Sequence, residues 1–197
     1  MLKYFLIIGL SYLIGSIPFS YITAKVMGNI DIRNYGSGNT GATNVFRTLG
    51  LKAGFTAFFL DFLKGFVPAI IAKKLFDIDL AVLASVFAVV GHCYSFWLGF
   101  KGGKGVATTG GTIFALYPVI GLILLVLQFT LIFTTRIMSL ASISTAFLFP
   151  IISYFMDTNS LFVIYATGLG IFVIYKHKSN IQRLLNGTES KMSLKKK

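Results

Sequence analysis

The chain has 197 residues, of which 55% are hydrophobic and only 12% charged, and its mean hydropathy is +0.80. Soluble domains carry about 25% charged residues, so this composition excludes an ordinary soluble fold and places the chain in a lipid bilayer. The formal net charge is +12, which in a membrane protein favours anionic lipids or anionic substrates over nucleic acid as partners. One cysteine excludes internal disulfides and a multi-cysteine metal site, and two histidines leave little for a zinc site.

Six apolar blocks approach or exceed the length that crosses a bilayer. They cover residues 4–26, 53–76, 80–99, 109–134, 137–156 and 160–175. The first block is too long for the apolar core of a signal peptide and lacks a cleavage pattern, so we expect a retained first span.

Basic residues are concentrated in the links at 30–52 and 101–104 and after residue 175, whereas Asp77, Asp79 and Asp157 lie in short links. The positive-inside rule puts the basic links in the cytoplasm and the acidic links outside. Block 109–134 would then begin and end inside, which a single span cannot do.

Pro118 and Gly121 interrupt that block, and an internal proline breaks a helix. The pattern predicts two shortened helices at about 108–117 and 119–134. The expected fold is therefore an all-α integral membrane protein with seven transmembrane helices, the N-terminus outside and the C-terminus inside. The alternative is one tilted span, which would put the C-terminal end of the chain outside.

The chain is expected to form a single polytopic membrane domain over residues 1–186. Residues 187–197 follow as a basic cytoplasmic tail, which we expect to be disordered and attracted to anionic lipid.

Asp61 and Lys64 lie three residues apart inside the second apolar block. Charges inside a membrane are costly and are functional candidates by default, but we favour a neutralising intrahelical pair that faces the bundle. His92 has no acid four or five residues further on, so a helical His–Asp dyad of the soluble acyltransferase type is absent. We expect His92 to be a hydrogen-bonded structural residue.

The stretch "GSGNTGATNVFRTLG" matches G-x-G-x-x-G at Gly36–Gly41. A dinucleotide site would need a βαβ unit around it, which an apolar helical chain does not supply. Glycines still allow backbone N–H groups to point at an anion, and Asn39 or Thr40 is expected to cap a short helix ending near Leu49. The candidate phosphate ligands of this stretch are Ser37, Asn39, Thr43 and Arg47. The alternative is a flexible loop with a lipid-facing arginine.

A second glycine-rich stretch, "KGGKG" at 101–105, precedes another apolar block. It is not a Walker A motif, because Leu98 stands where a glycine is required and Gly105 follows the lysine. Lys104 among open backbone amides suits an anion. The alternative is a lysine anchor at the membrane interface, with Trp97 and Tyr94 in an aromatic belt.

In the third stretch, "YKHKSNIQRLLNGTE", His177, Asn180 and Arg183 recur at helical spacing opposite an apolar face. This pattern is typical of an amphipathic helix at the inner interface, although a plain basic juxtamembrane segment has the same composition. All three stretches are expected on one side, where Asp31 and Glu189 are the only acids. Such a site would bind anions and stabilise charge without two-carboxylate chemistry.

Together these three stretches resemble the three motifs of the bacterial membrane glycerol-3-phosphate acyltransferases of the PlsY type, over nearly the whole chain. The resemblance implies transfer of a fatty acyl group from acyl phosphate to the 1-hydroxyl of glycerol 3-phosphate. The products would be lysophosphatidic acid and inorganic phosphate, in the first step of phospholipid synthesis at the bacterial plasma membrane. Thr40 departs from a frequent proline of the family, which should alter loop stiffness only.

By matching position, the resemblance implies a catalytic set and a substrate-binding set on the cytoplasmic side. The catalytic set is Ser37, Arg47, Lys104, His177 and Asn180, and the substrate-binding set is Asn39, Thr43, Gly102 and Gly103. The implied partners are acyl phosphate, glycerol 3-phosphate and membrane lipids, without nucleic acid, metal or cofactor, and we expect a monomer. The main alternative is a transporter or channel for phosphate or a phosphate ester, which would need a polar path through both leaflets.

Overall fold

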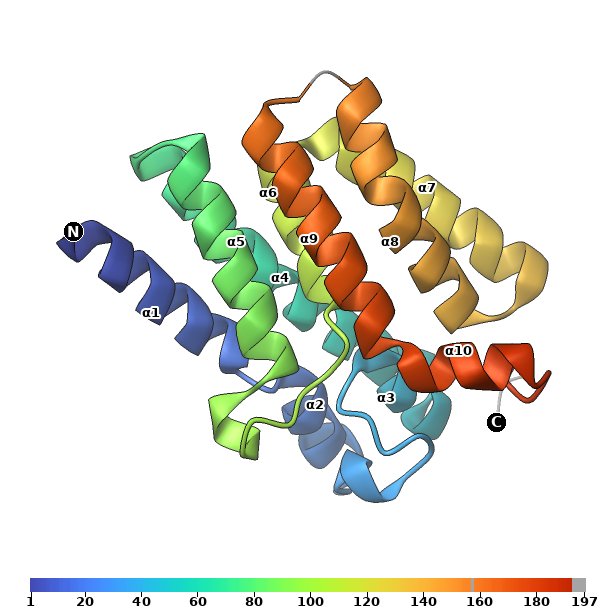
Figure 1. Cartoon of the computed structure of the whole chain (residues 1–197). Coiled ribbons are helices and arrows are strands. Elements are labelled where there is room, and N and C mark those ends of the chain that lie inside the picture. Colours follow the sequence, from blue (N-terminus) through green and yellow to red (C-terminus); the bar gives the residue numbers. More distant parts are fainter. Residues whose placement is uncertain (157, 193–197) are drawn as a thin grey trace. The chain divides into compact units, whose positions relative to one another are not determined.

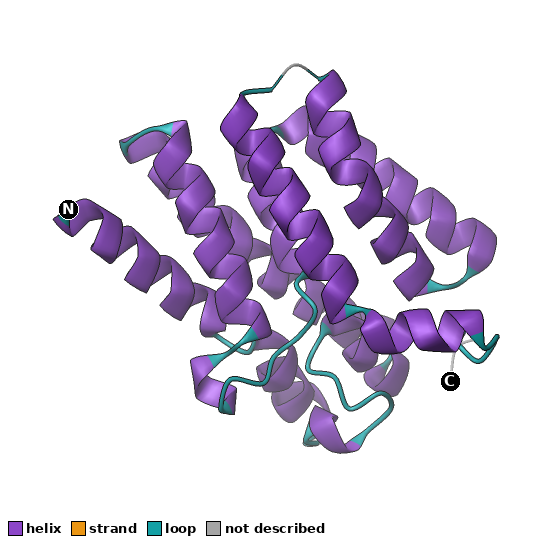
Figure 2. Cartoon of the chain, in the orientation of Figure 1, coloured by secondary structure: helices purple, strands orange, loops and turns teal. Residues whose placement is uncertain are grey.

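The computed structural model describes residues 1–156 and 158–192, and within these ranges every regular element is a helix (Figures 1 and 2). The predicted all-helical fold class is thus confirmed. The chain divides into two compact units, one formed by Met1–Leu116 and the other beginning at Tyr117.

The first unit begins with a helix that is broken by a proline. Helices α1 and α2 are the two halves of the predicted first span, and they separate at Ile17 and Pro18 because proline cannot continue the helix. The bounds in this unit are α1 Leu2–Ser16, α2 Phe19–Gly28, η1 Ile32–Asn34, α3 Ala42–Leu49, α4 Leu51–Leu75, α5 Ile78–Cys93, η2 Phe96–Leu98 and α6 Val106–Leu116.

Helix α4 is the centre of this unit and packs against α2, α3, α5 and α6, while α1 packs against α5. Glycines allow α4 and α6 to approach closely, since a Cβ at Gly65 would overlap the Thr108 carbonyl and one at Gly111 would overlap the Phe62 carbonyl. The Lys73 ammonium donates to the carbonyls of Ala115 and Leu116 at 3.3 and 2.5 Å. It thereby satisfies carbonyls that the end of α6 would otherwise leave unpaired.

The order of these helices gathers the polar loops at one end of the unit. Helix α3 leads through Gly50 directly into α4, and α5 returns along α4 after the short link at Phe76 and Asp77. The start of α4 and the end of α5 therefore lie at the same end. The loop before α3 and the loop after α5 both emerge there, as Figure 1 shows.

The second unit contains α7 Pro118–Thr135, α8 Met138–Phe155, α9 Ser160–Lys176 and α10 Lys178–Leu185. Gln128 of α7 bonds to Ser142 and Thr145 of α8 at 3.2 and 2.8 Å, which satisfies its amide inside an apolar helix pair. Phe149 of α8 packs edge-to-face on Phe162 of α9. Helix α10 is bent by 61° from α9.

The predicted division of block 109–134 is confirmed, because α6 ends at Leu116 and Pro118 begins α7. Proline is well suited to a first helical position, where its missing N–H has no intrahelical partner to lose. Within the described residues, five helical segments are long and apolar enough to span a bilayer, six if the bent pair α9–α10 counts as one. Helix α6 is shorter, with 11 residues.

The packed part of the chain extends further than the predicted boundary at residue 186. Glu189 is hydrogen-bonded to three side chains of the second unit, and the Met192 amide donates to the Arg136 carbonyl at 2.7 Å. Residues 187–192 are therefore folded onto that unit and are not part of a disordered tail. Residues 193–197 and Asp157, for which the sequence predicts a tail and an external link, lie outside the described residues.

Candidate functional site

The loop between η1 and α3 takes its shape from two glycines. Gly36 and Gly38 have φ angles of +58° and +69°, a left-handed conformation that glycine adopts at little cost. The Gly38 amide closes a turn on the Tyr35 carbonyl at 3.0 Å. Ser37 lies between the two glycines and is exposed.

One buried side chain, Asn44 in the first turn of α3, holds this loop together. Its Oδ1 accepts from the Ser37 amide at 2.9 Å, and its Nδ2 lies 3.2, 2.9 and 3.0 Å from the carbonyls of Ile32, Tyr35 and Asn39. Only 2% of Asn44 is exposed. The positions of Ser37 and Asn39 are therefore determined by a helix residue that is itself fixed in the core.

The predicted side-chain cap of α3 is wrong. The helix begins at Ala42, so its N-cap is Gly41, which has extended backbone and no side chain to offer. A Cβ at this position would lie 2.9 Å from Asn39 Oδ1, so a larger residue here would displace the Asn39 side chain. The predicted end of the helix is confirmed, since Leu49 is its last residue and Gly50 follows with φ of +85°.

Thr43 and Arg47 lie on successive turns of α3 and are both partly exposed, as their spacing predicted. Lys104 is also partly exposed, in the loop between η2 and α6. The Gly103 amide in that loop donates to the His92 carbonyl at 3.2 Å. The structure thus places the predicted residues of the first two motifs in loops and a short helix at one end of the first unit (Figure 1).

His177 and Asn180 belong to the second unit, at the bend between α9 and α10, and both are buried. His177 Nδ1 lies 2.7 Å from the Val173 carbonyl. A carbonyl only accepts, so Nδ1 carries the proton, and in the neutral ring Nε2 is the acceptor. Asn180 Nδ2 donates to Glu189 at 2.8 Å, which fixes the orientation of the amide.

Glu189 holds the end of the second unit together. Its carboxylate accepts from Ser139 at 2.9 Å, from Asn180 at 2.8 Å and from Arg183 at 2.6 Å. Burial would raise the pKa of this carboxyl, but the hydrogen bonds from Asn180, Arg183 and Ser139 outweigh it and hold the pKa below its ordinary value. Glu189 is thus kept as a charged structural acceptor.

In the first unit, the carboxylate of Asp31 is also engaged. Its carboxylate pairs with Arg33 at 2.6 Å, and the hydrogen bond from that guanidinium lowers the pKa of Asp31 to about 2. Within residues 1–156 and 158–192, no group of three or more His, Cys, Asp or Glu side chains is arranged to hold a metal ion. The arrangement at both sets of motif residues is suited to binding an anion.

Comparison with known proteins identifies the family. The family model described as glycerol-3-phosphate acyltransferase matches residues 5–187. The chain belongs to the glycerol-3-phosphate acyltransferase family. A glycerol-3-phosphate acyltransferase of Fusobacterium nucleatum is 45% identical over 96% of this chain and 98% of its own length, and one of Aquifex aeolicus is 48% identical over 91% and 94%.

Solved structures of the same family have the same fold. The glycerol 3-phosphate form of PlsY (YgiH), an integral membrane glycerol 3-phosphate acyltransferase, matches with a TM-score of 0.93 and 41% identity over 97% of this chain and 96% of that one. Its lysophosphatidic acid form matches with a TM-score of 0.91 and 40% identity. The family resemblance inferred from the three motifs is confirmed, as is an integral membrane fold.

Three features of this acyltransferase were missed in the sequence. Asn44 stands inside the first motif, yet nothing in its spacing marks it as the residue that bonds four loop positions. Glu189 was noted only as one of few acids. His92 has no acid four or five residues further on, but Asp61 of the neighbouring helix α4 faces it, with His92 Nδ1 3.6 Å from Asp61 Oδ1. The available signal for Asp61 was its charge among apolar neighbours.

We predict that Asn44→Ala lowers the free energy of unfolding by about 2 kcal/mol, because buried backbone groups of the loop lose their partner. Transfer of acyl groups to glycerol 3-phosphate should fall at least about tenfold, since misplaced binding groups lose catalysis steeply. Thermal unfolding in detergent and initial rates measure the two effects. Asn34→Ala, which removes an exposed asparagine at the end of η1, just before the loop, is the matched control, and equal behaviour of the two variants would contradict the role of Asn44.

The Glu189 contacts predict a pH dependence for the C-terminal segment. Because the folded pKa is depressed, the stabilisation is complete above the ordinary glutamate pKa of about 4.3 and is lost as pH falls through the lower folded value. Hydrogen-exchange protection at Thr188 and Met192, whose amides bond to Arg183 and Arg136, should therefore decrease in that acidic range. Glu189→Gln should lack this transition, and an unchanged transition in the variant would refute the assignment.

Proposed function

We propose that this acyltransferase takes its acyl group from acyl phosphate and transfers it to the 1-hydroxyl of glycerol 3-phosphate. The products are lysophosphatidic acid and inorganic phosphate. Support for the acceptor and the ester product comes from the two solved relatives, which carry glycerol 3-phosphate and lysophosphatidic acid. Support for the donor comes from the carboxylates near the motifs, which are already engaged in ion pairs within the protein.

The observation that carries the donor assignment is that the carboxylates near the motifs are already occupied. Asp31 is paired with Arg33, Asp61 with Lys64, and Glu189 with Arg183. Asp77 and Asp79 lie at the start of α5, at the opposite end of the first unit from the glycine loops. Among the described residues, therefore, no carboxylate near the motif loops is placed as a general base, and the reaction should be one that needs none.

Acyl phosphate meets this condition, because it is a mixed anhydride whose phosphate is already a good leaving group. The 1-hydroxyl oxygen of glycerol 3-phosphate forms a bond to the acyl carbon, and the bond between that carbon and the phosphate oxygen breaks. The hydroxyl proton passes to an oxygen of the departing phosphate. The protein has to bring the substrates together and stabilise charge on the phosphates and on the acyl oxygen.

We propose a separate role for the motif residues of each unit. Arg47 and Lys104 offset the charge of the phosphates, and Ser37 contacts the substrate from the glycine loop. Gly102 and Gly103 allow close backbone approach, while Asn39 and Thr43 complete the phosphate contacts. His177 and Asn180 are proposed to bind substrate by hydrogen bonds, since His177 presents an acceptor at Nε2 in its neutral form.

We also propose seven membrane spans, with the N-terminus outside and the motif loops and C-terminus in the cytoplasm. The separate helices α6 and α7 support this count. The basic residues of the three motifs support the orientation. Both glycine loops emerge at one end of the first unit, as a site on a single membrane face requires.

The donor assignment predicts that purified protein converts palmitoyl phosphate and glycerol 3-phosphate into ester and inorganic phosphate in equal amounts. Palmitoyl-coenzyme A and palmitoyl-acyl carrier protein should give no ester. Arg47→Ala and Lys104→Ala should each lower kcat/KM by about 10²-fold or more, because each removes a charge-stabilising donor. Lys74→Ala, which removes an exposed lysine at the far end of α4, should keep the full rate.

Three results would overturn parts of this assignment. Phosphate release without ester would exclude acyl transfer from acyl phosphate, and turnover of the thioester donors would replace the donor. Full activity in both Arg47→Ala and Lys104→Ala would remove these cations from the site.

The proposed topology predicts where a reporter fused after Lys197 is found. In intact cells, a fluorescent reporter that folds only in the cytoplasm should be bright, and alkaline phosphatase at the same position should be inactive. The opposite pair of signals would mean that block 109–134 crosses the membrane once.

A further inference from the structure

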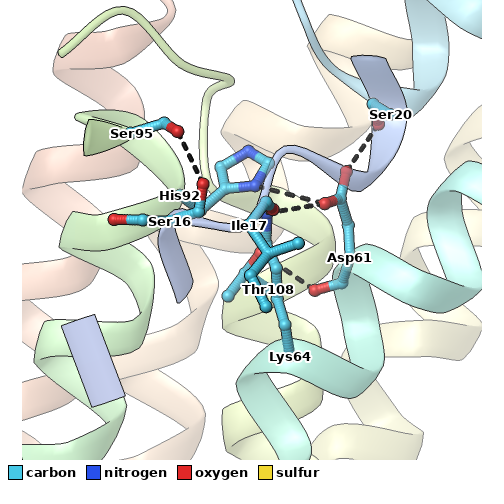
Figure 3. A network of polar contacts seen from close by, with 8 residues as sticks. All are labelled: Ser16, Ile17, Ser20, Asp61, Lys64, His92, Ser95 and Thr108. Carbon is cyan, nitrogen blue, oxygen red and sulfur yellow. Dashed lines mark hydrogen bonds and ion pairs between the residues drawn. The ribbon is translucent and has the colours of Figure 1, made fainter. Parts of the chain in front are cut away.

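A buried polar network joins four segments of the first unit, and Figure 3 shows it from close by. Asp61 of α4 accepts from Ser20 of α2 through Oδ2 at 2.5 Å, and its Oδ1 lies 2.7 Å from Lys64 Nζ. Lys64 Nζ also donates to the Ile17 carbonyl at 2.8 Å, at the break between α1 and α2. Asp61 and Lys64 are only 1% and 4% exposed, so these protein groups replace water around both charges.

If Asp61 and Lys64 only neutralised each other within α4, the Asp61 carboxylate would need no contact with other helices. Here the Asp61 carboxylate faces the ring of His92 from α5, with His92 Nδ1 3.6 Å from Asp61 Oδ1 (Figure 3). This distance is longer than a hydrogen bond, yet it is short enough for the carboxylate to favour the ring orientation that points Nδ1 toward it. The Asp61 carbonyl, in addition, accepts from Thr108 in the first turn of α6 at 3.0 Å.

The Lys101–Gly105 loop in turn packs against His92. Its carbonyl accepts from the Gly103 amide at 3.2 Å. A Cβ on Gly103 would overlap His92 Nε2, and a Cβ on Gly102 would overlap the His92 carbonyl. The loop therefore lies directly on the ring and backbone of His92. The turn before the loop is anchored as well, since Ser95 donates to the Ser16 carbonyl at 2.5 Å.

We propose that Asp61 and His92 are positioning residues of the acyltransferase, which hold the Lys101–Gly105 loop in the shape that binds a substrate phosphate. Asp61 fixes the ring of His92, and the ring fixes the backbone at Gly102 and Gly103, so that Lys104 is presented at a defined place. Lys64 and Ser20 keep the Asp61 carboxylate in its position. The inference rests on the proposed function in one respect, the binding of phosphate by this loop.

The first test removes the charge of Asp61 without leaving the Lys64 ammonium unpaired. Asp61→Asn alone would leave Lys64 buried and uncompensated, which is strongly destabilising, so Asp61→Asn is combined with Lys64→Met. The KM for a phosphate-bearing substrate and the inhibition constant for inorganic phosphate should rise together by about tenfold, while kcat changes less than about threefold. A purely structural role would lower the active fraction, and hence the apparent kcat, without moving either constant. Values within about twofold of the parent protein overturn the proposal.

The second test probes the contact between ring and loop and does not depend on the first variant folding. Gly103→Ala should raise the same two constants, because its methyl group would overlap His92 Nε2. His92→Asn should also raise both constants, because the loop loses the ring against which it packs. In the double variant the smaller asparagine leaves room for the methyl group, so the combined effect should be at least about fivefold below the product of the single effects. Independent, multiplying effects contradict the proposed contact.

Two controls separate this inference from the proposed function. Ser85→Ala removes a buried α5 hydroxyl that donates to the Ala81 carbonyl of its own helix, and should leave both constants unchanged. Lys104→Ala is assayed in parallel. If it leaves all constants unchanged, the loop does not bind phosphate and the proposed function fails at this point. If it weakens phosphate binding and the Asp61 and His92 variants do not, the positioning role alone is refuted.

Discussion

The carboxylate of Asp61 lies on a membrane-spanning helix, where water cannot solvate it and each of its oxygens needs a partner from the protein. Ser20 and Lys64 supply those partners, and Lys64 in turn bonds to a carbonyl at the break between α1 and α2. Helices α2 and α4 and the α1–α2 break must therefore keep their places for the charge to be tolerated. The glycine contacts of α4 with α6 then bring a further helix close enough to bond the backbone at Asp61.

The same demand for partners explains why the motif loops are ordered. A loop rich in glycine and small polar residues has much conformational entropy to lose, and it keeps one shape only if side chains bond its backbone. Asn44 does so for the loop before α3, and the carbonyl and ring of His92 do so for the loop before α6. In the second unit Glu189 has this function for α10, through Asn180 and Arg183.

This arrangement has a chemical consequence for an acyltransferase. Asp31, Asp61 and Glu189 are engaged in contacts within the protein, whereas Arg47 and Lys104 are partly exposed, in a short helix and a loop. A site of this kind is suited to holding phosphate groups and to stabilising charge that develops during reaction. It is poorly suited to removing a proton with a side-chain carboxylate, which is why we propose an activated donor such as acyl phosphate.

The sequence by itself determined the all-helical membrane fold, the break at Pro118 and the three motifs that identify the family, because hydropathy, helix-breaking residues and motif spacing are local properties of a chain. It also placed Thr43 and Arg47 on one short helix and its end at Leu49. Only the tertiary structure decided that Gly41 begins that helix, that Asn44 organises the loop before it, and that residues 187–192 are folded. The tertiary structure also decided that Asp61 faces His92. This contact depends on how α4 and α5 cross, and no periodicity along either helix specifies a contact between them.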